Sequence, residues 1–280
     1  MREISCELIA SAVERLCIEA ATVLQPSLGI LLECAAESEE SPAGISALED
    51  IVENFKYAAA NSIPICQDTG MTVVFADIGQ DVHIAGGAFA DAVDEGVRRG
   101  YEKGLLRMSV VSDPLRRKNT NDNTPCVLHV RLAPGESIDL HVAPKGFGSE
   151  NMSAMRMFIP SDTVETIEDF IVETVSKAGS NPCPPVILGV GLGGTIEQCA
   201  LIAKRALLRP ADTRNNDDFY ACMELRTLEK INRLGIGPQG FGGRYTAVAV
   251  NIEAYPTHIA GLPCVVNVGC HATRHAHAKL

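Results

Sequence analysis

The chain has 280 residues and 46% hydrophobic content, which is enough for one large domain or two ordinary ones with a substantial core. Its 35 acidic side chains outnumber the 24 basic ones, the net charge is −11 and Trp is absent, which argues against nucleic-acid binding. No apolar run approaches the ~20 residues of a membrane span, and Glu3 and Glu7 stand where a signal peptide would be apolar. We therefore expect a cytoplasmic protein that binds neither membranes nor nucleic acids.

The first 60 residues are predicted to be entirely helical, because apolar residues recur at helical spacing from Ile4 onward. Pro26 and the segment 41–44 break this region into pieces, and Ser46 is expected to cap the last piece. Residues 71–78 are rich in Val, Thr and Phe and predict a strand. Residues 86–106 predict a long helix that ends near Gly104.

The middle of the chain changes to strand-like alternation. Residues 126–132 and 137–142 predict an antiparallel pair joined by a turn at 133–135, preceded by an exposed polar loop at 113–124. Beyond them, the predicted helices 163–178, 195–208 and 218–234 are interspersed with the predicted strands 186–190, 245–254 and 263–268. The whole pattern predicts an α/β protein with mixed sheets flanked by helices and a helical N-terminal region.

The chain contains ten cysteines and no export signal, so reduced thiols or metal ligands are expected rather than disulfides. No two form a Cys-x-x-Cys pair, which disfavours a zinc ribbon. Seven fall in predicted helices or strands and are expected to be small buried apolar residues: Cys6, Cys17, Cys34, Cys126, Cys199, Cys222 and Cys264.

The other three cysteines, Cys66, Cys183 and Cys270, lie among Pro, Gly and polar residues, as in loops that present ligands. For these three, metal or cluster ligation and a purely structural role both stay open at this point. A cluster held by only three thiolates would leave one iron free to polarise a substrate hydroxyl or carboxylate, whereas a ferredoxin typically supplies four. The trio therefore favours catalysis over electron transfer.

The segment Gly189–Gly194 has the G-x-G-x-x-G spacing of a dinucleotide-binding turn between a strand and a helix. The acid that should end a second parallel strand would be Asp212, which lies in a predicted loop. A nucleotide-dependent oxidoreductase is therefore the disfavoured alternative. The helix N-terminus after the turn stays a candidate to face an anion or a cluster.

Several polar residues outside the cysteine segments are candidates for substrate contacts, each with an ordinary alternative. Arg107 and the segment 145–151 could hold a carboxylate or be surface charge and a plain turn. His258 follows a predicted strand and is either a site residue or a structural histidine. His277 is expected to belong to a solvated chain end.

Seven segments, in this order and spacing, resemble the class I iron–sulfur-dependent fumarate hydratases, above all the alpha subunit of the two-subunit forms. L-tartrate dehydratase alpha subunits are very similar. The resemblance runs from about residue 40 to the end and implies an iron–sulfur hydro-lyase alpha domain over residues 1–280, with 1–60 as a helical subregion. The segments that carry it are 65–70, 145–151, 183–185, 193–195, 237–243, 256–258 and 262–270.

The resemblance implies a four-iron, four-sulfur cluster ligated by Cys66, Cys183 and Cys270, with an open iron that binds the substrate's hydroxyl and neighbouring carboxylate. It also implies a set of residues around the substrate, with Asp68 as a candidate proton donor. In this set Gln67 and Asp68 lie beside the substrate, Arg107, Lys145 and the Gly148 backbone hold its carboxylates, and His258 completes the pocket.

The implied activity is the reversible hydration of fumarate to malate, with L-tartrate dehydration or a non-catalytic cluster-binding scaffold as alternatives. Two departures from the single-chain members, at Phe147 and at 271–273, bear on the substrate. Those members continue into a second domain beyond the part that corresponds to this chain. The resemblance therefore implies a separate beta subunit that completes the active site, in a heterotetramer.

Overall fold

The computed structural model describes all 280 residues, which fall into two compact units. Unit 1 comprises Met1–Leu24, Phe55–Phe147 and Arg274–Leu280, and unit 2 comprises Gln25–Asn54 and Gly148–Thr273. The N-terminal region is helical, as predicted, except for a short first strand. It contains α1 (Cys6–Thr22) in unit 1, α2 (Pro26–Ser38) in unit 2, and α3 (Pro42–Asn61), whose residues are divided between the units.

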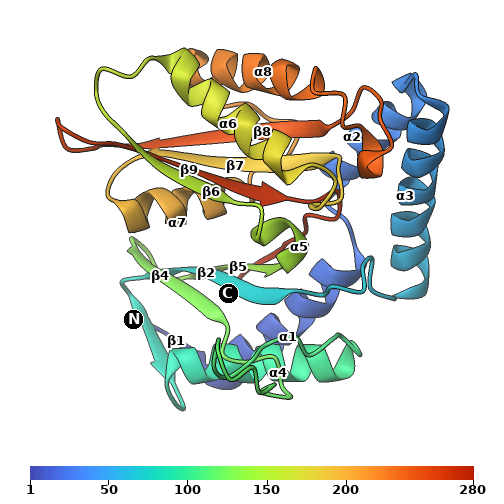
Figure 1. Ribbon diagram of the computed structural model, residues 1–280. Helices are drawn as coiled ribbons and strands as arrows, with labels where there is room; N and C mark the ends of the chain where they lie inside the picture. The colour runs from blue at the N-terminus through green and yellow to red at the C-terminus, as the bar shows by residue number, and fades with distance from the viewer. The chain divides into compact units, whose positions relative to one another are not determined.

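Unit 1 is built on a four-stranded mixed sheet in the order β10-β5-β2-β4. The helices α1 and α4 (Phe89–Lys103) cover one face of this sheet (Figure 1). The core between them contains Val74, Leu140 and Val142 from the sheet and Val13 and Val97 from the helices. The strands are β2 (Met71–Gly79), β4 (Val127–Ala133), β5 (Ile138–Lys145) and β10 (Ala276–Lys279), and a separate parallel pair is formed by β1 (Arg2–Ser5) and β3 (Val82–Ala85).

The predicted hairpin of β4 with β5 is wrong, because β2 lies between these two strands. Val74 of β2 pairs with Leu128 of β4 in parallel and with Val142 of β5 in antiparallel direction. Residues 72–76 of β2 are all buried, so this strand needs a neighbour on each side. Alternation identified the strands correctly, but it carries no information on which strands pair.

Unit 2 has a second four-stranded mixed sheet in the order β6-β9-β7-β8, covered by helices on both faces. The helices α6 and α8 lie on one face and α7 on the other (Figure 1). Both units therefore confirm the predicted class of mixed sheets flanked by helices. The elements are α5 (Phe147–Glu150), β6 (Ala154–Phe158), α6 (Val164–Ala178), β7 (Val186–Gly193), α7 (Ile196–Ala206), α8 (Asp218–Asn232), the 3-10 turn η1 (Pro238–Gly240), β8 (Ala247–Tyr255) and β9 (Leu262–Gly269).

Local signals located most helix starts and missed the short strands. Thr163 caps α6 and Asp217 caps α8 through their side chains, each at the start of a predicted helix. Ser46 does not act as a cap, because α3 begins at Pro42. The prediction of a solvated end for the histidine-rich C-terminus is wrong, because residues 276–279 form β10 at the edge of the unit 1 sheet.

The glycines of the G-x-G-x-x-G pattern have a packing role in β7. A Cβ atom on Gly189 would lie 2.1 Å from the carbonyl oxygen of Ala203, and one on Gly191 would lie 2.2 Å from that of Cys199. Both carbonyls belong to α7, so these glycines let the helix backbone lie directly on the strand. Asp212 lies in a turn beyond α7, as expected. The pattern is explained without a nucleotide.

One helical stretch, Cys6–Ser38, is long and apolar enough to cross a membrane by length and composition alone. Half of its most apolar window is buried inside the protein, and a buried core helix or an N-terminal signal sequence passes the same test of length and composition.

Candidate functional site

The cysteines divide by environment. Cys17, Cys199 and Cys264 lie in the interior, Cys126 is half-buried, and burial raises the pKa of Cys199 to about 11 and that of Cys17 to about 12. Burial likewise raises the pKa of Cys126 and Cys264, so all four stay neutral thiols near neutral pH. The expectation that all seven helical and strand cysteines are buried is wrong for Cys34 and Cys222, which lie on the solvent faces of α2 and α8. Cys6 and Cys126 are only half-buried, and Cys126 lies just before β4.

Cys66 lies in a half-exposed loop of unit 1 between α3 and β2. The loop begins at the buried Ile65, whose backbone N–H donates to the carbonyl oxygen of Ala21 at 2.9 Å. Gln67 follows on the exposed side of the loop. The next residue, Asp68, is held from several directions.

The Asp68 carboxylate accepts two backbone hydrogen bonds, from Gly70 to Oδ1 at 3.0 Å and from Phe147 to Oδ2 at 2.9 Å. Arg274 donates to the Asp68 carbonyl oxygen. Gly70, at a φ of +78°, lies so close to Lys145 that a Cβ atom there would be 2.7 Å from its backbone. These contacts fix the Asp68 carboxylate and bring the segments 66–70 and 145–147 together, two parts of the resemblance far apart in sequence.

The other side of the loop is held by buried side chains. The Tyr101 hydroxyl, on α4, donates to the carbonyl oxygens of Thr69 and Gly70 at 2.8 and 3.0 Å, and Asn123 donates to the latter at 3.2 Å. The Thr69 hydroxyl accepts from the Arg107 backbone N–H at 2.9 Å and lies 3.2 Å from the Arg107 carbonyl oxygen. Asn123 is fully buried, which contradicts the prediction of exposure for the end of the loop 113–124.

Two cationic side chains accompany this loop in unit 1. Arg107 is tied to Thr69 through its backbone and has an exposed side chain. Lys145, at the end of β5, is buried, and its Nζ lies 3.3 Å from the Gly146 carbonyl oxygen. Unit 1 therefore gathers five of the predicted site residues around one loop: Cys66, Gln67, Asp68, Arg107 and Lys145. The segments that meet here carry a thiol, a carboxylate and two cationic side chains, a combination that suits a small anionic substrate.

Cys183 and Cys270 lie at one end of the unit 2 sheet. Cys183 precedes β7 and Cys270 follows β9, and because these strands are antiparallel the two segments meet, with Ile187 opposite Gly269. His271 fixes the junction, donating to the Cys183 carbonyl oxygen from its backbone at 3.3 Å and from Nδ1 at 2.9 Å. Cys183 has a φ of +55° and is exposed, and Cys270 is half-buried.

The glycine-rich segment 237–243 packs beside this junction. The Gln239 backbone and side-chain amides donate to the Pro184 carbonyl oxygen at 2.8 and 2.7 Å. Glu39 anchors the far end, accepting from the backbone N–H groups of Arg244 and Tyr245. Burial would raise the pKa of Glu39, but these and neighbouring backbone hydrogen bonds outweigh it and lower the pKa.

A cavity of about 530 Å³ opens in unit 2 between α3 and this segment. Gln239, Phe241 and His271 line one side and residues of α3, including Asp50 and Asn54, line the other. His271 immediately follows Cys270, so the cavity adjoins the meeting point of the two cysteine segments. It is large enough for a small dicarboxylate.

The remaining two predicted residues of unit 2 are placed differently. Gly148 lies in α5. A Cβ atom added to it would have one neighbour within 4 Å, the Asn181 carbonyl oxygen at 3.7 Å, so its backbone is open to a ligand. His258 lies in the exposed loop after β8. Because β8 runs parallel to β7, this loop is at the opposite end of the sheet from Cys183, about 20 Å along the strands. The structure does not bring His258 to the two cysteines of its own chain.

Several positioning residues were missed by sequence reasoning. In the sequence, Tyr101 has the pattern of a helical core residue and Glu39 that of a surface acid. Only the fold shows that Tyr101 holds the Cys66 loop and that Glu39 holds the end of the segment 237–243. Asn123 was hidden in a polar stretch that resembled an exposed loop. A signal existed only for Gln239, which belongs to a segment of the family resemblance.

The donor set suits an iron–sulfur cluster. Cys66, Cys183 and Cys270 all lie in loops and are at least partly exposed, with no helix or strand backbone to constrain the thiol; Cys126, the other cysteine outside a helix or strand, has a pKa raised by burial. Thiolates from loops are the usual ligands of such clusters, and neutral buried thiols such as Cys17 are unsuited.

Comparison with known proteins shows the family of the chain. Residues 10–279 match the sequence model of the family described as fumarate hydratase (fumerase). A Methanocaldococcus jannaschii protein, provisionally named L(+)-tartrate dehydratase subunit alpha, is 40% identical over 278 residues, 97% of each chain. The L(+)-tartrate dehydratase subunit alpha of Escherichia coli strain UTI89 is 31% identical over 241 residues, 85% of this chain and 79% of the relative.

Proposed function

Because the chain belongs to the fumarate hydratase family it is a hydro-lyase, and we propose that it is the cluster-bearing alpha subunit of an enzyme that reversibly hydrates fumarate to malate. The observation that carries the proposal is the convergence in unit 1 of Asp68, Arg107 and Lys145 on the Cys66 loop. This combination supplies a proton-transfer group and two carboxylate-binding cations beside a candidate ligand.

We assign a four-iron, four-sulfur cluster to Cys66, Cys183 and Cys270. When bound by three thiolates, such a cluster supplies a Lewis acid at the iron that has no protein ligand. The proposal requires that Cys66 of unit 1 and the paired cysteines of unit 2 bind the same cluster.

The chain's own residues are assigned to binding and proton transfer. Arg107 and Lys145 supply positive charge for the two carboxylates of the substrate in a chain whose overall net charge is −11. Asp68, oriented by the Gly70 and Phe147 N–H groups, is placed to donate or accept the proton at the substrate. Gln67 and the Gly148 backbone supply hydrogen bonds. His258 is retained as the residue that completes the pocket, although the loop that carries it lies at the other end of the unit 2 sheet from Cys183.

A second substrate is favoured by a specific observation. The relatives at 40% and 31% identity both carry the name L(+)-tartrate dehydratase subunit alpha. L-tartrate differs from malate by one hydroxyl, so a few contacts decide between the substrates.

We further propose a beta subunit, in a heterotetramer, as the partner that completes the site. The word "alpha" in the relatives' names supports a partner subunit. The cytoplasm is the proposed compartment, because ten free cysteines need a reducing environment.

The test is to reconstitute the chain anaerobically with iron and sulfide, alone and with the beta subunit encoded beside it. Fumarate absorbance after adding malate and oxaloacetate formation from L-tartrate are then followed. Turnover of malate only in the pair is the expected result. Turnover of L-tartrate alone would replace the substrate and keep the hydro-lyase, and cluster uptake without turnover of either would favour a non-catalytic scaffold.

A further inference from the structure

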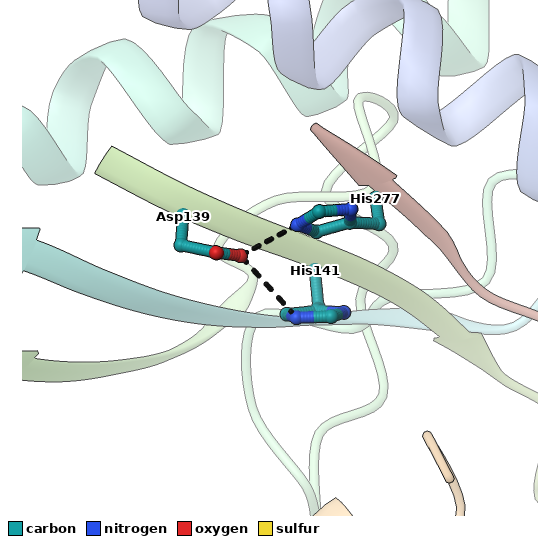
Figure 2. Close-up of side chains that lie close together, drawn as sticks. All are labelled: Asp139, His141 and His277. Atoms are coloured by element: carbon teal, nitrogen blue, oxygen red, sulfur yellow. Dashed lines mark hydrogen bonds and ion pairs between the residues drawn. The ribbon is translucent and has the colours of Figure 1, made fainter. Parts of the chain in front are cut away.

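A group of metal-ligand side chains lies in unit 1 apart from the cysteine loop. Asp139 and His141 are on β5 and His277 is on β10, and one ligand atom of each lies within 4.8 Å of the other two. Figure 2 shows the carboxylate of Asp139 facing both imidazole rings. None of these three residues has a part in the proposed hydration.

The sheet itself brings the three side chains to one side. Residues 139 and 141 alternate along β5 and so point to the same face, and His277 pairs directly with His141 across the strands. The two imidazoles stack with ring centroids 4.4 Å apart. The arrangement is therefore fixed by backbone register rather than by flexible loops, which favours a preformed site.

The donor atoms converge on one carboxylate oxygen. Nε2 of His277 lies 2.6 Å and Nε2 of His141 lies 3.4 Å from Oδ1 of Asp139. Metal bonds of about 2.1 Å in a tetrahedral site place ligand atoms roughly 3.4 Å apart, so a small opening of the Asp139–His277 contact would admit an ion.

We propose that Asp139, His141 and His277 bind a divalent ion of the zinc class. Two imidazoles and one carboxylate suit Zn²⁺ and similar transition ions better than Mg²⁺ or Ca²⁺, which prefer oxygen ligands. The side chains of Asp139 and His277 are 36% and 46% exposed, so an ion has access and water fills the fourth position.

The surrounding charges are compatible with this ion. Asp139 lies opposite Lys279 of β10 on one side and opposite Asp77 of β2 on the other, and Asp77 forms an ion pair with Arg131 at 2.6 Å. The one neighbouring carboxylate, Asp77, is thus already paired with a cation, and the ion would join β10 to β5. The structural consequence is a C-terminal strand held to the sheet by a metal.

The test uses the full-length chain with Cys66, Cys183 and Cys270 changed to Ser, so that the cluster thiols cannot capture the metal. Zn²⁺ binding is measured by competition with a chromophoric chelator, and amide hydrogen exchange of residues 276–279 is followed with and without Zn²⁺. The comparison set is His277→Gln, His141→Gln, Asp139→Asn and the control His83→Gln, on β3.

We expect one Zn²⁺ per chain, at least about tenfold weaker binding in each of the three ligand variants, and slower exchange in β10 with Zn²⁺ only where the ligands are intact. The His83 variant should match its parent. Equal Zn²⁺ affinity in the parent and the ligand variants, or no Zn²⁺ binding in the folded parent, would reduce the group to an ion pair between Asp139 and His277 and overturn the proposal.

Discussion

The two regions that carry the proposed cluster ligands are built by different means. In unit 2, strand pairing alone joins the ends of β7 and β9 and thereby brings Cys183 and Cys270 together. In unit 1, side chains from α4, the loop 113–124 and the C-terminal segment hold the Cys66 loop through hydrogen bonds to its backbone. The unit 2 pair therefore depends on the packing of its sheet, and the Cys66 loop depends on a few polar atoms.

The largest effect on activity is expected from the carboxylate of the Cys66 loop. Asp68→Asn keeps only one of the two oxygens that accept backbone hydrogen bonds, and it removes the proton-transfer group, so kcat in the two-subunit enzyme should fall by about 10²–10⁴. Asp81→Asn, on the exposed turn before β3, is the control. Unchanged kcat in the Asp68 variant would remove this residue from the chemistry.

The arrangement of Cys183 and Cys270 in unit 2 should be disrupted by a bulkier residue in β7, because it depends on the packing of the sheet and not on a single polar atom. Gly189→Ala places a Cβ atom 2.1 Å from the Ala203 carbonyl oxygen, so it should destabilise the protein by about 3 kcal/mol or more. Gly261→Ala, whose Cβ would have no neighbour closer than 3.8 Å, should change little. Urea denaturation measures both, and equal stability of the two variants would show that α7 does not need the close approach.

The Cys66 loop should respond to the loss of one hydroxyl. Tyr101→Phe leaves the Thr69 and Gly70 carbonyl oxygens without this donor and should cost about 1–3 kcal/mol in unfolding free energy. Tyr57→Phe, at a residue 58% exposed, is the matched control. We also expect weaker cluster retention in the Tyr101 variant, and retention equal to that of the wild type would show that the loop is held without this residue.

The smallest effect concerns the buried thiols and alkaline pH. Burial raises the pKa of Cys199 to about 11, so the folded state keeps a proton that the unfolded chain loses near pH 9. Stability from this group is complete below about pH 8 and is lost as the pH rises toward 11, with a loss of about 1 kcal/mol at pH 10. Cys199→Ala should show a correspondingly smaller decline between pH 8 and 10, and exposed Cys34→Ala should not differ from wild type.

Sequence reasoning succeeded where the signal is local. Turn-forming neighbours separated Cys66, Cys183 and Cys270 from the other cysteines, and their loop placement agrees with that separation. Helix caps such as Thr163 located element starts. Strand pairing is a non-local property, so the position of β2 between β4 and β5 could not be read from alternation, and neither could β10.

Burial of helical cysteines was also beyond local reasoning. Cys17 and Cys34 both occur in apolar helices, but only Cys17 faces a packed neighbour helix, and Cys34 faces solvent. The position of His258 shows the same limit, because a residue twelve positions from Cys270 in sequence lies at the other end of the same sheet.

The most direct test of the central claim is the iron and sulfide content of the anaerobically reconstituted chain and its Cys→Ser variants. We expect each of three variants to lose the cluster: Cys66→Ser, Cys183→Ser and Cys270→Ser. We expect Cys199→Ser and Cys222→Ser to retain it. A Cys66 variant that keeps a full cluster, or a Cys199 variant that loses it while still folded, would contradict the assignment of one cluster to the three loop cysteines.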